Sequence, residues 1–174
     1  WRSSAAQHSQ SLESWYAHIP GLVVVCPSTP QDNYAMMKAA IACDDPVVYL
    51  EHKNLWLLEG DVDTTAPGEF GRAHLRRSGS DVTIVSWSDT ANVAVKAADD
   101  LATLGISAEV LDLVSIWPWD KAAVMASVAK TGRLVVAHEA VQVGGFGAEV
   151  VATVAQTAPQ LLKAPIQRVG APPS

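Results

Sequence analysis

The chain has 174 residues, of which 49% are hydrophobic and 17% are charged, and its formal net charge is −6. This length provides room for one large or two small domains with a substantial core. The acidic balance argues against a nucleic-acid partner, because binding to phosphates needs a basic face. The longest apolar runs, 22–26 and 134–137, are far too short to cross a bilayer, so we expect no membrane partner.

The two cysteines, Cys26 and Cys43, do not form a CxxC pair. Two cysteines in a chain of this length are typical of small buried hydrophobic side chains rather than of a disulfide framework. The first residues do not resemble a signal peptide. Together these features predict a reducing, intracellular location.

The first third of the chain predicts a strand–helix–strand unit. Residues 21–25 form a continuous β-branched run that is typical of a buried strand, and 47–50 form another. Thr29, Pro30 and Asp32 fit the cap, first and third positions of a helix that should run to about residue 42. Such a unit closes right-handed in a parallel sheet. The helix is expected to bury four apolar side chains: Met36, Met37, Ala40 and Ile41.

The rest of the chain predicts a second, complete α/β unit. Glycines, a proline and several charges between 54 and 80 indicate a linker. Beyond it, strands are expected at 82–85, 108–113, 134–137 and 166–169, and helices at 91–104, 120–130 and 146–158. This alternation predicts an α/β fold with a mostly parallel sheet covered on both faces. The expected domains are 1–58 and 81–174, joined by a linker at 59–80, and the first domain looks incomplete.

The block Gln7-His8-Ser9-Gln10-Ser11-Leu12-Glu13 is the strongest candidate for chemistry. A histidine between amides and hydroxyls, ahead of the first hydrophobic strand, indicates a polar pocket. Histidine titrates near neutral pH and can give or take a proton. The alternative is a surface histidine in a capping segment, since Ser9 or Ser11 could begin a helix.

Two further segments could bind an ion or a substrate. The turn from Ala40 to Pro46 follows a helix C-terminus, whose unpaired carbonyl groups favour a cation, although a plain turn without metal fits equally well. Glu51-His52-Lys53 ends a strand, where α/β proteins often place functional groups. Ordinary ion pairing at a domain edge is the interpretation that we favour for it.

Three other motifs are interpreted mainly as structural. Gly144-Gly145-Phe146-Gly147 precedes a helix but lacks the third glycine of a dinucleotide fingerprint, so we expect a packing role. His138-Glu139 follows a strand and suggests an interface or buried pair. Trp117-Pro118-Trp119 offers a large apolar surface that belongs either to the core or to a subunit interface.

Taken in order, five blocks carry a family resemblance: 7–13, 27–30, 44–47, 51–53 and 144–149. They resemble the beta subunit of the thiamin-diphosphate-dependent decarboxylase component of 2-oxoacid dehydrogenase complexes, a transketolase-like family. The resemblance covers the chain from about Gln7 to its end. It implies part of a pyrimidine-binding-type domain followed by a transketolase C-terminal-type α/β domain. It also implies decarboxylation of a 2-oxo acid on thiamin diphosphate and reductive acylation of a lipoyl group of a dihydrolipoyl acyltransferase.

The same resemblance assigns roles to individual residues. His8 would be the catalytic histidine in the channel where the cofactor, the 2-oxo acid and the lipoyl group meet. Ser9 and Gln10 would support its loop. A structural potassium ion would be held, mostly through main-chain oxygens, by a set in which Cys43 replaces the usual acidic residue: Ala40, Ile41, Cys43 and Asp45.

The cofactor and partners implied by the resemblance lie largely outside this chain. The Gly-Asp-Gly signature that binds magnesium does not occur, and the glutamate that faces the pyrimidine ring is absent. Thiamin diphosphate and magnesium would therefore be held mainly by other residues, including those of an alpha subunit or alpha-like region. A second beta subunit is a further expected partner. Alone, the chain is expected to be inactive, and its expected location is the cytoplasm, or the mitochondrial matrix in a eukaryote.

Two alternatives remain open. A transketolase-like carboligase subunit, such as a split transketolase, uses the same domains, although the block from Gln7 to Glu13 favours the dehydrogenase. A non-catalytic module for dimerisation or docking is the other alternative. Binding of thiamin diphosphate to the completed assembly would separate an enzyme from such a module.

Overall fold

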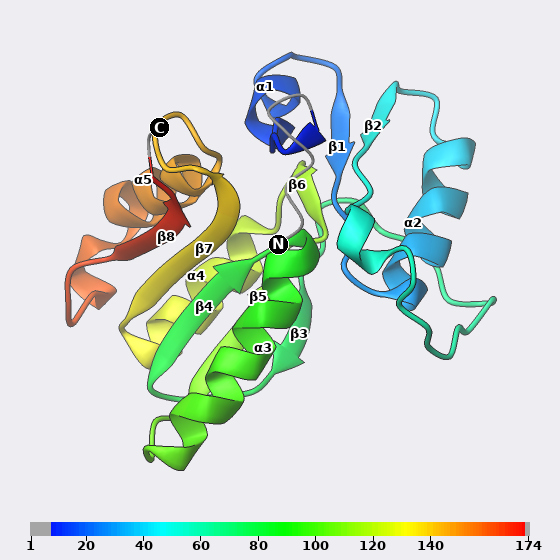
Figure 1. The fold of residues 1–174 in the computed structure, drawn as a ribbon. Coiled ribbons are helices and arrows are strands. Elements are labelled where there is room, and N and C mark those ends of the chain that lie inside the picture. The colour runs from blue at the N-terminus through cyan, green and yellow to red at the C-terminus, as the bar shows by residue number, and fades with distance from the viewer. Residues whose placement is uncertain (1–7, 173–174) are drawn as a thin grey trace.

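Two β-sheets organise the molecule, and the computed structural model describes residues 8–172 (Figure 1). The first sheet has the strand order β2-β1-β6, and the second has the order β3-β5-β4-β7-β8. Neighbouring strands run parallel except for the pairs β1–β6 and β3–β5. The predicted α/β class with a mostly parallel sheet is confirmed. Within residues 8–172, no helix is long and apolar enough to span a membrane.

The first sheet contains the strand–helix–strand unit that the sequence predicts. Its elements, after the short helix α1 (Glu13–Ala17), are β1 (Val23–Val25), α2 (Pro30–Ala42) and β2 (Val47–Tyr49). The hydroxyl of Thr29 accepts a hydrogen bond from the amide of Asp32 at 3.0 Å, so the helix begins where the capping signal places it. Strands β1 and β2 pair in parallel, as predicted.

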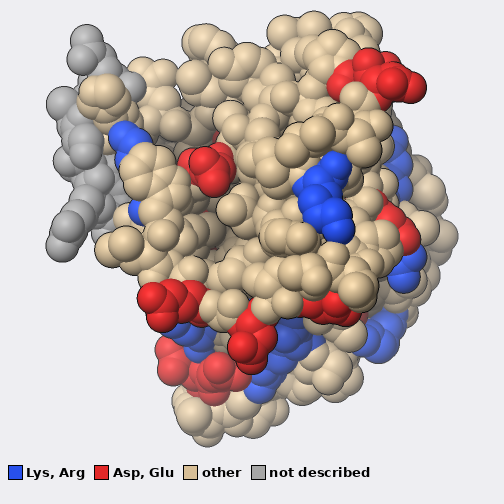
Figure 2. All heavy atoms as spheres, turned by 90° about the vertical axis from the view of Figure 1, so that its right-hand side faces the viewer, with Lys and Arg blue, Asp and Glu red and all other residues tan. Residues whose placement is uncertain are grey.

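Only one side of α2 is buried. Ala35 and Met36 are buried, and Met36 packs with Val23 and Val25. The prediction that Met37 and Ile41 are buried is wrong, because their side chains are 37% and 80% exposed on the outer side of the helix. No element within residues 8–172 covers them. Figure 2 views the molecule from this side, and uncharged side chains make up most of the face.

The second sheet carries helices on both faces (Figure 1). Ile84 and Val110 pack with α3, whereas the adjacent strand residues Val85 and Leu111 share a cluster with side chains of α4 and α5. Successive strand residues point to opposite faces, so both faces are apolar. The elements are β4 (Val82–Ser86), α3 (Ser88–Thr103), β5 (Ala108–Asp112), α4 (Lys121–Thr131), β7 (Leu134–Val141), α5 (Gly147–Thr157) and β8 (Gln167–Ala171). Two short 3₁₀ helices are η2 (Lys53–Leu55) and η3 (Pro159–Leu161).

The structure contains two short strands that the sequence does not predict. β3 (His74–Arg77) lies inside the segment expected to be a linker, 59–80, and pairs antiparallel with β5. That segment is therefore not simply a linker. β6 (Ser115–Trp117) follows β5 in the chain but pairs antiparallel with β1 in the other sheet. The second half of the chain thus contributes a strand to the first sheet.

The junction between the sheets is part of the main hydrophobic core. Cys26, at the end of β1, shares a buried cluster with Trp87, Trp119 and Phe146 of the second half. The rings of Trp119 and Phe146 meet edge to face, with their centroids 6.3 Å apart. Trp117 is partly exposed at the surface, so one tryptophan of this motif belongs to the core and the other does not. Both cysteines are free thiols, and burial raises the pKa of the Cys26 thiol.

Candidate active site at the domain junction

His8, Ser9 and Gln10 lie together in the loop before α1. His8 and Gln10 are exposed and Ser9 is partly buried. The three residues and Ser11 line one side of a cavity of about 130 Å³. The other side is formed by Glu51, His52, Lys53, Asn54 and Glu139. The structure therefore brings the His8 block beside the Glu51-His52-Lys53 segment, while Gln7 lies outside the described residues.

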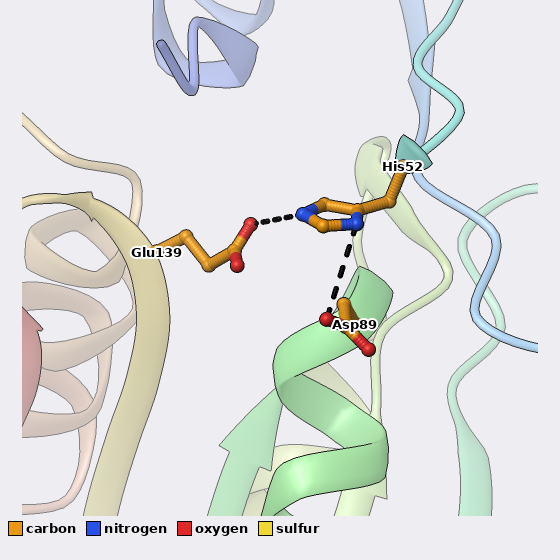
Figure 3. Close-up of side chains that lie close together, drawn as sticks. All are labelled: His52, Asp89 and Glu139. Atoms are coloured by element: carbon orange, nitrogen blue, oxygen red, sulfur yellow. Dashed lines mark ion pairs between the residues drawn. The ribbon is translucent and has the colours of Figure 1, made fainter. Parts of the chain in front are cut away.

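His52 connects the two halves of the molecule at this cavity. Its Nε2 lies 2.6 Å from Oε2 of Glu139, which belongs to β7 (Figure 3). Its Nδ1 accepts a hydrogen bond from the Asn54 amide at 3.1 Å and lies 3.9 Å from Oδ2 of Asp89 in the first turn of α3. Because Nδ1 is an acceptor, the ring proton lies on Nε2 and is donated to Glu139. This pairing agrees with the interpretation of the segment as an ion-paired domain edge.

Neighbouring carboxylates set the charge of His52. The hydrogen bond to Glu139 is the main cause that raises the pKa of His52, and the charges of Glu139 and Asp89 act in the same direction. Burial opposes them but does not outweigh them. A second proton, on Nδ1, would have to displace the Asn54 amide and would face Asp89. His52 can therefore carry a positive charge at a higher pH than an isolated histidine.

The same three side chains could in principle hold a metal ion. One ligand atom from each of His52, Asp89 and Glu139 lies within 4.8 Å of the others. However, Glu139 approaches Nε2 and Asp89 approaches Nδ1, on opposite edges of the ring (Figure 3). An ion bound at one ring nitrogen would have to displace the hydrogen bond that this nitrogen now makes, to Glu139 or from the Asn54 amide, so the geometry suits a shared proton better than a metal.

A second cavity, of about 210 Å³, adjoins His52 and contains a buried acid. Glu13, His52, Trp87 and Glu139 are among its lining residues. Glu13 accepts a hydrogen bond from Nε1 of Trp87 at 3.1 Å. Burial is the main cause that raises the pKa of Glu13, and the charge of Glu139 adds to it. The sequence places Glu13 in the strongest motif, but only the fold shows that its carboxyl group is buried beside Glu139.

Deeper in the junction lies a network of buried carboxylates. The Ser28 hydroxyl lies within hydrogen-bond distance of Asp32, at 3.1 Å, and of Asp112, and its one proton can be donated to either carboxylate. Arg76 of β3 pairs with Asp112 at 2.9 Å, and His74 pairs with Asp32 at 2.8 Å. Burial raises the pKa of Asp112 to about 6. Nothing in the sequence signals this network, because its members come from three separate segments.

The glycine-rich block packs around a buried histidine. A Cβ atom on Gly145 or Gly147 would approach the ring of His138 to 2.8 or 2.6 Å. The ring stacks on Trp87, and its Nδ1 lies 3.1 Å from the carbonyl oxygen of Ala140. Burial lowers the pKa of His138, so this ring is neutral. The block therefore makes room for His138, which agrees with its structural interpretation.

The predicted potassium ligands lie at the C-terminal end of α2 and in the turn that follows. The amide of Cys43 donates to the carbonyl oxygen of Ala40 at 3.4 Å, so that carbonyl is already partly engaged. Asp45 is exposed, as is the side chain of Ile41. Potassium binding by Ala40, Ile41, Cys43 and Asp45 stays a prediction.

The cavities around His52 do not suit a diphosphate group. Glu13, Glu51 and Glu139 are among their lining residues, whereas Lys53 supplies the one permanent positive charge among the described lining residues. Negative charges repel a diphosphate and cannot replace the amide cradle or cations that such groups need. The residues present here do not fit the diphosphate, and they suit the surroundings of a reacting group instead.

Comparison with known families covers both halves of the chain. Residues 2–57 match the family model described as the transketolase pyrimidine binding domain. Residues 71–174 match the model described as the transketolase C-terminal domain. The order of the two domains is the order that the sequence resemblance implied.

Relatives with similar sequences are beta subunits of oxidoreductases. The chain is 46% identical to the acetoin:2,6-dichlorophenolindophenol oxidoreductase subunit beta of Cupriavidus necator, over 97% of this chain and 50% of that protein. It is 45% identical to the pyruvate dehydrogenase E1 component subunit beta of Leifsonia xyli, over 93% of this chain and 48% of that protein. It is 42% identical to the 3-methyl-2-oxobutanoate dehydrogenase subunit beta of Mycobacterium tuberculosis, over 95% of this chain and 48% of that protein.

A solved structure described as a split gene transketolase, inactive beta4 tetramer, has a similar fold. It superposes with a TM-score of 0.81 at 26% identity, over 97% of this chain and 54% of that chain. The present chain thus spans about half the length of each of these relatives. With matches to the transketolase pyrimidine-binding and C-terminal domains over residues 2–57 and 71–174, the chain belongs to the transketolase family, and its sequence relatives are beta subunits of 2-oxoacid dehydrogenases.

Proposed function

We propose that this chain is the C-terminal part of the beta subunit of a 2-oxoacid dehydrogenase. The parent enzyme would decarboxylate a 2-oxo acid on thiamin diphosphate and reductively acylate a lipoyl group of a dihydrolipoyl acyltransferase. The observation that carries the proposal is the position of His8, which faces His52 and Glu139 across a small cavity where the two family domains meet. The relatives, described as oxidoreductase and dehydrogenase beta subunits, support the reaction class.

His8 is the proposed acid–base group of the site. It lies at the protein surface, where a substrate or a lipoyl arm can reach it. A ring nitrogen of His8 would hold or deliver a proton to the reacting group. The cavity behind it, of about 130 Å³, has room for only a few water molecules, since each occupies about 30 Å³ in the liquid. Ser9 and Gln10 would fix the loop that carries the histidine.

The cofactor and partners of the complete enzyme follow from the same proposal. Thiamin diphosphate and magnesium would be held mainly by residues outside this chain, since the acidic cavities do not suit a diphosphate. An alpha subunit or alpha-like region, a second beta subunit and the acyltransferase would be its protein partners, and a structural potassium ion would sit at the end of α2. The complex would work in the cytoplasm, or in the mitochondrial matrix of a eukaryote.

A carboligase of the transketolase type fits less well. The transketolase structure is 26% identical to this chain, whereas the dehydrogenase beta subunits are 42–45% identical over similar lengths. The proposed reaction therefore follows the nearer sequences rather than the shared fold.

The test uses the complete beta chain, produced together with its alpha partner and assayed with a panel of 2-oxo acids. We expect His8→Ala to lower kcat/KM by about a hundredfold or more, because a positioned acid–base group contributes about that much. His18→Ala, an exposed histidine at the end of α1, is the matched control and should change the rate less than twofold. An active His8→Ala enzyme would overturn the proposal, and so would a complete assembly that turns over no 2-oxo acid. The 174-residue chain alone should show no turnover.

A further inference from the structure

We infer that His52 and Glu139 are positioning residues for His8, so that the C-terminal domain takes part in the active site through Glu139. This inference rests on the proposed function. It adds a role for two residues in the same site, on opposite sides of the domain junction. His52 comes from the segment after β2, and Glu139 comes from β7 of the second sheet.

The first support is the place of the pair among the cavities. His52 lines the cavity that contains His8 and also two neighbouring cavities of about 210 and 460 Å³. Glu139 lines the first two of these three. The pair therefore forms a shared wall between the spaces next to the His8 loop.

The second support is that the His52 ring is held at both ends. The Asn54 amide donates to Nδ1 at 3.1 Å, and Nε2 lies 2.6 Å from Glu139 (Figure 3). A ring fixed in this way cannot rotate or exchange its two nitrogens without losing a hydrogen bond. Its one proton is therefore kept at a defined place on the wall of the His8 cavity.

The third support is the charge around His52. The titratable and charged groups that face it are Glu51 and Lys53 on its own segment, Asp89 on α3, Glu139 on β7, and Glu13 and His8 across the two cavities. Four of these six are carboxylates, so when the ring takes up a second proton, at the cost of the Asn54 hydrogen bond, its charge balances part of a negative surface. Across a few confined water molecules, such a charge acts on His8 more strongly than it would through bulk water.

If the His52–Glu139 ion pair only connected the two domains, it would not need to lie beside the His8 cavity. His74 of β3 and Asp32 of α2 already form an ion pair between the halves, and the Asp32 side chain is only 4% exposed. The side chains of His52 and Glu139 are each about 20% exposed and open onto the cavities. An exposed ion pair stabilises a fold only slightly, so the pair is better placed to act on the site than to hold the domains together.

The test compares Glu139→Gln with the control Asp100→Asn in the complete enzyme. Asp100 is an exposed carboxylate on α3 of the same domain, so its loss changes the net charge equally. For Glu139→Gln we expect kcat for lipoyl acylation to fall about tenfold, the size of a small misplacement of a catalytic group, with KM within about twofold. The limb of the pH profile that reports His52 should move to lower pH, because the Glu139 carboxylate that raises the pKa of His52 is gone. Glu139→Asp should restore part of the rate.

A readout independent of turnover is hydrogen exchange of the peptide that contains residues 8–13. This peptide should exchange faster in Glu139→Gln than in the wild type, and its exchange rate should be unchanged in Asp100→Asn. If Glu139→Gln alters thermal stability but leaves the rate, the pH profile and this exchange unchanged, the pair is only a structural tie and the inference is wrong. An inactive His8→Ala enzyme beside a normal Glu139→Gln enzyme would overturn this inference alone, whereas an active His8→Ala enzyme would overturn the proposed function.

Discussion

Two ion-pair bridges lie where the halves of the molecule meet, one between β3 and β5 within the second sheet and one between the halves, and water reaches them to different extents. The pair Arg76–Asp112 lies at the buried junction, where the Asp112 side chain is 0% exposed. The pair His52–Glu139 lies beside cavities, with each side chain about 20% exposed. Burial makes the first bridge costly to break and difficult to ionise, whereas the second can change its proton state at small cost. Two bridges near one junction can thus serve different purposes, rigidity in one case and adjustment of a site in the other.

The largest loss of stability is expected for Arg76→Ala. Removing this partner leaves the Asp112 carboxylate buried without its counter-ion, which should lower the free energy of unfolding at pH 7 by about 3 kcal/mol or more. Urea denaturation measures the change. Arg72→Ala, which removes an exposed pair with Glu69, should cost no more than about 0.5 kcal/mol. The loss of stability for Arg76→Ala should shrink at pH 5, where Asp112 can become neutral. If Arg76→Ala cost no more stability than Arg72→Ala, the Arg76–Asp112 pair would not be the rigid bridge inferred here.

A second prediction concerns the pH dependence that Asp112 imparts. Its pKa is raised to about 6 from an ordinary value of 3.8, so the native state favours the protonated acid. Its contribution to stability is present below pH 3.8 and is lost as the pH rises through about 6. Asp112→Asn should therefore flatten the fall in stability between pH 4 and 6, by about 2 kcal/mol for a shift of this size. A wild-type protein that becomes no less stable across this window would contradict the assignment.

The smallest effect is expected for the stability of Glu139→Gln. An ion pair at this exposure should contribute about 0.5 kcal/mol. Because Glu139 raises the pKa of His52, the contribution is fully present below about pH 6.5 and is lost as the pH rises through the raised value. Thermal unfolding at pH 6 and pH 9 should show a small difference from the wild type only at pH 6. A loss as large as that of Arg76→Ala would mean that both bridges are structural.

Much of the fold could be predicted from local signals. The cap at Thr29 gives the start of α2, and Gly132, in the left-handed conformation, ends α4 where the sequence indicates. The two missed strands depend on distant partners. β3 is a charged, half-exposed edge strand, and β6 follows Val114, whose φ of +55° makes a turn that this β-branched residue type does not signal.

The candidate site was predictable only on one side. The His8 block and the Glu51-His52-Lys53 segment are visible in the sequence as polar residues at element ends. The sequence marks Glu139 only as a member of an interface or buried pair, and its distance from His52 is fixed only when β7 takes its place in the second sheet. Similarly, the exposure of Met37 and Ile41 could not be inferred from an apolar pattern, because the pattern does not say how many sides of a helix are covered.

The crossing of β6 into the first sheet has a consequence for recombination within the family. β6 pairs with β1, and the Cys26 amide donates to the carbonyl oxygen of Val114 at 2.7 Å. A chimera that exchanges the C-terminal domain at the apparent boundary would also exchange one strand of the neighbouring domain. Viable hybrids should therefore inherit residues 23–26 and 113–117 from the same parent, and crossover points between them should be tolerated only where these two segments are already compatible.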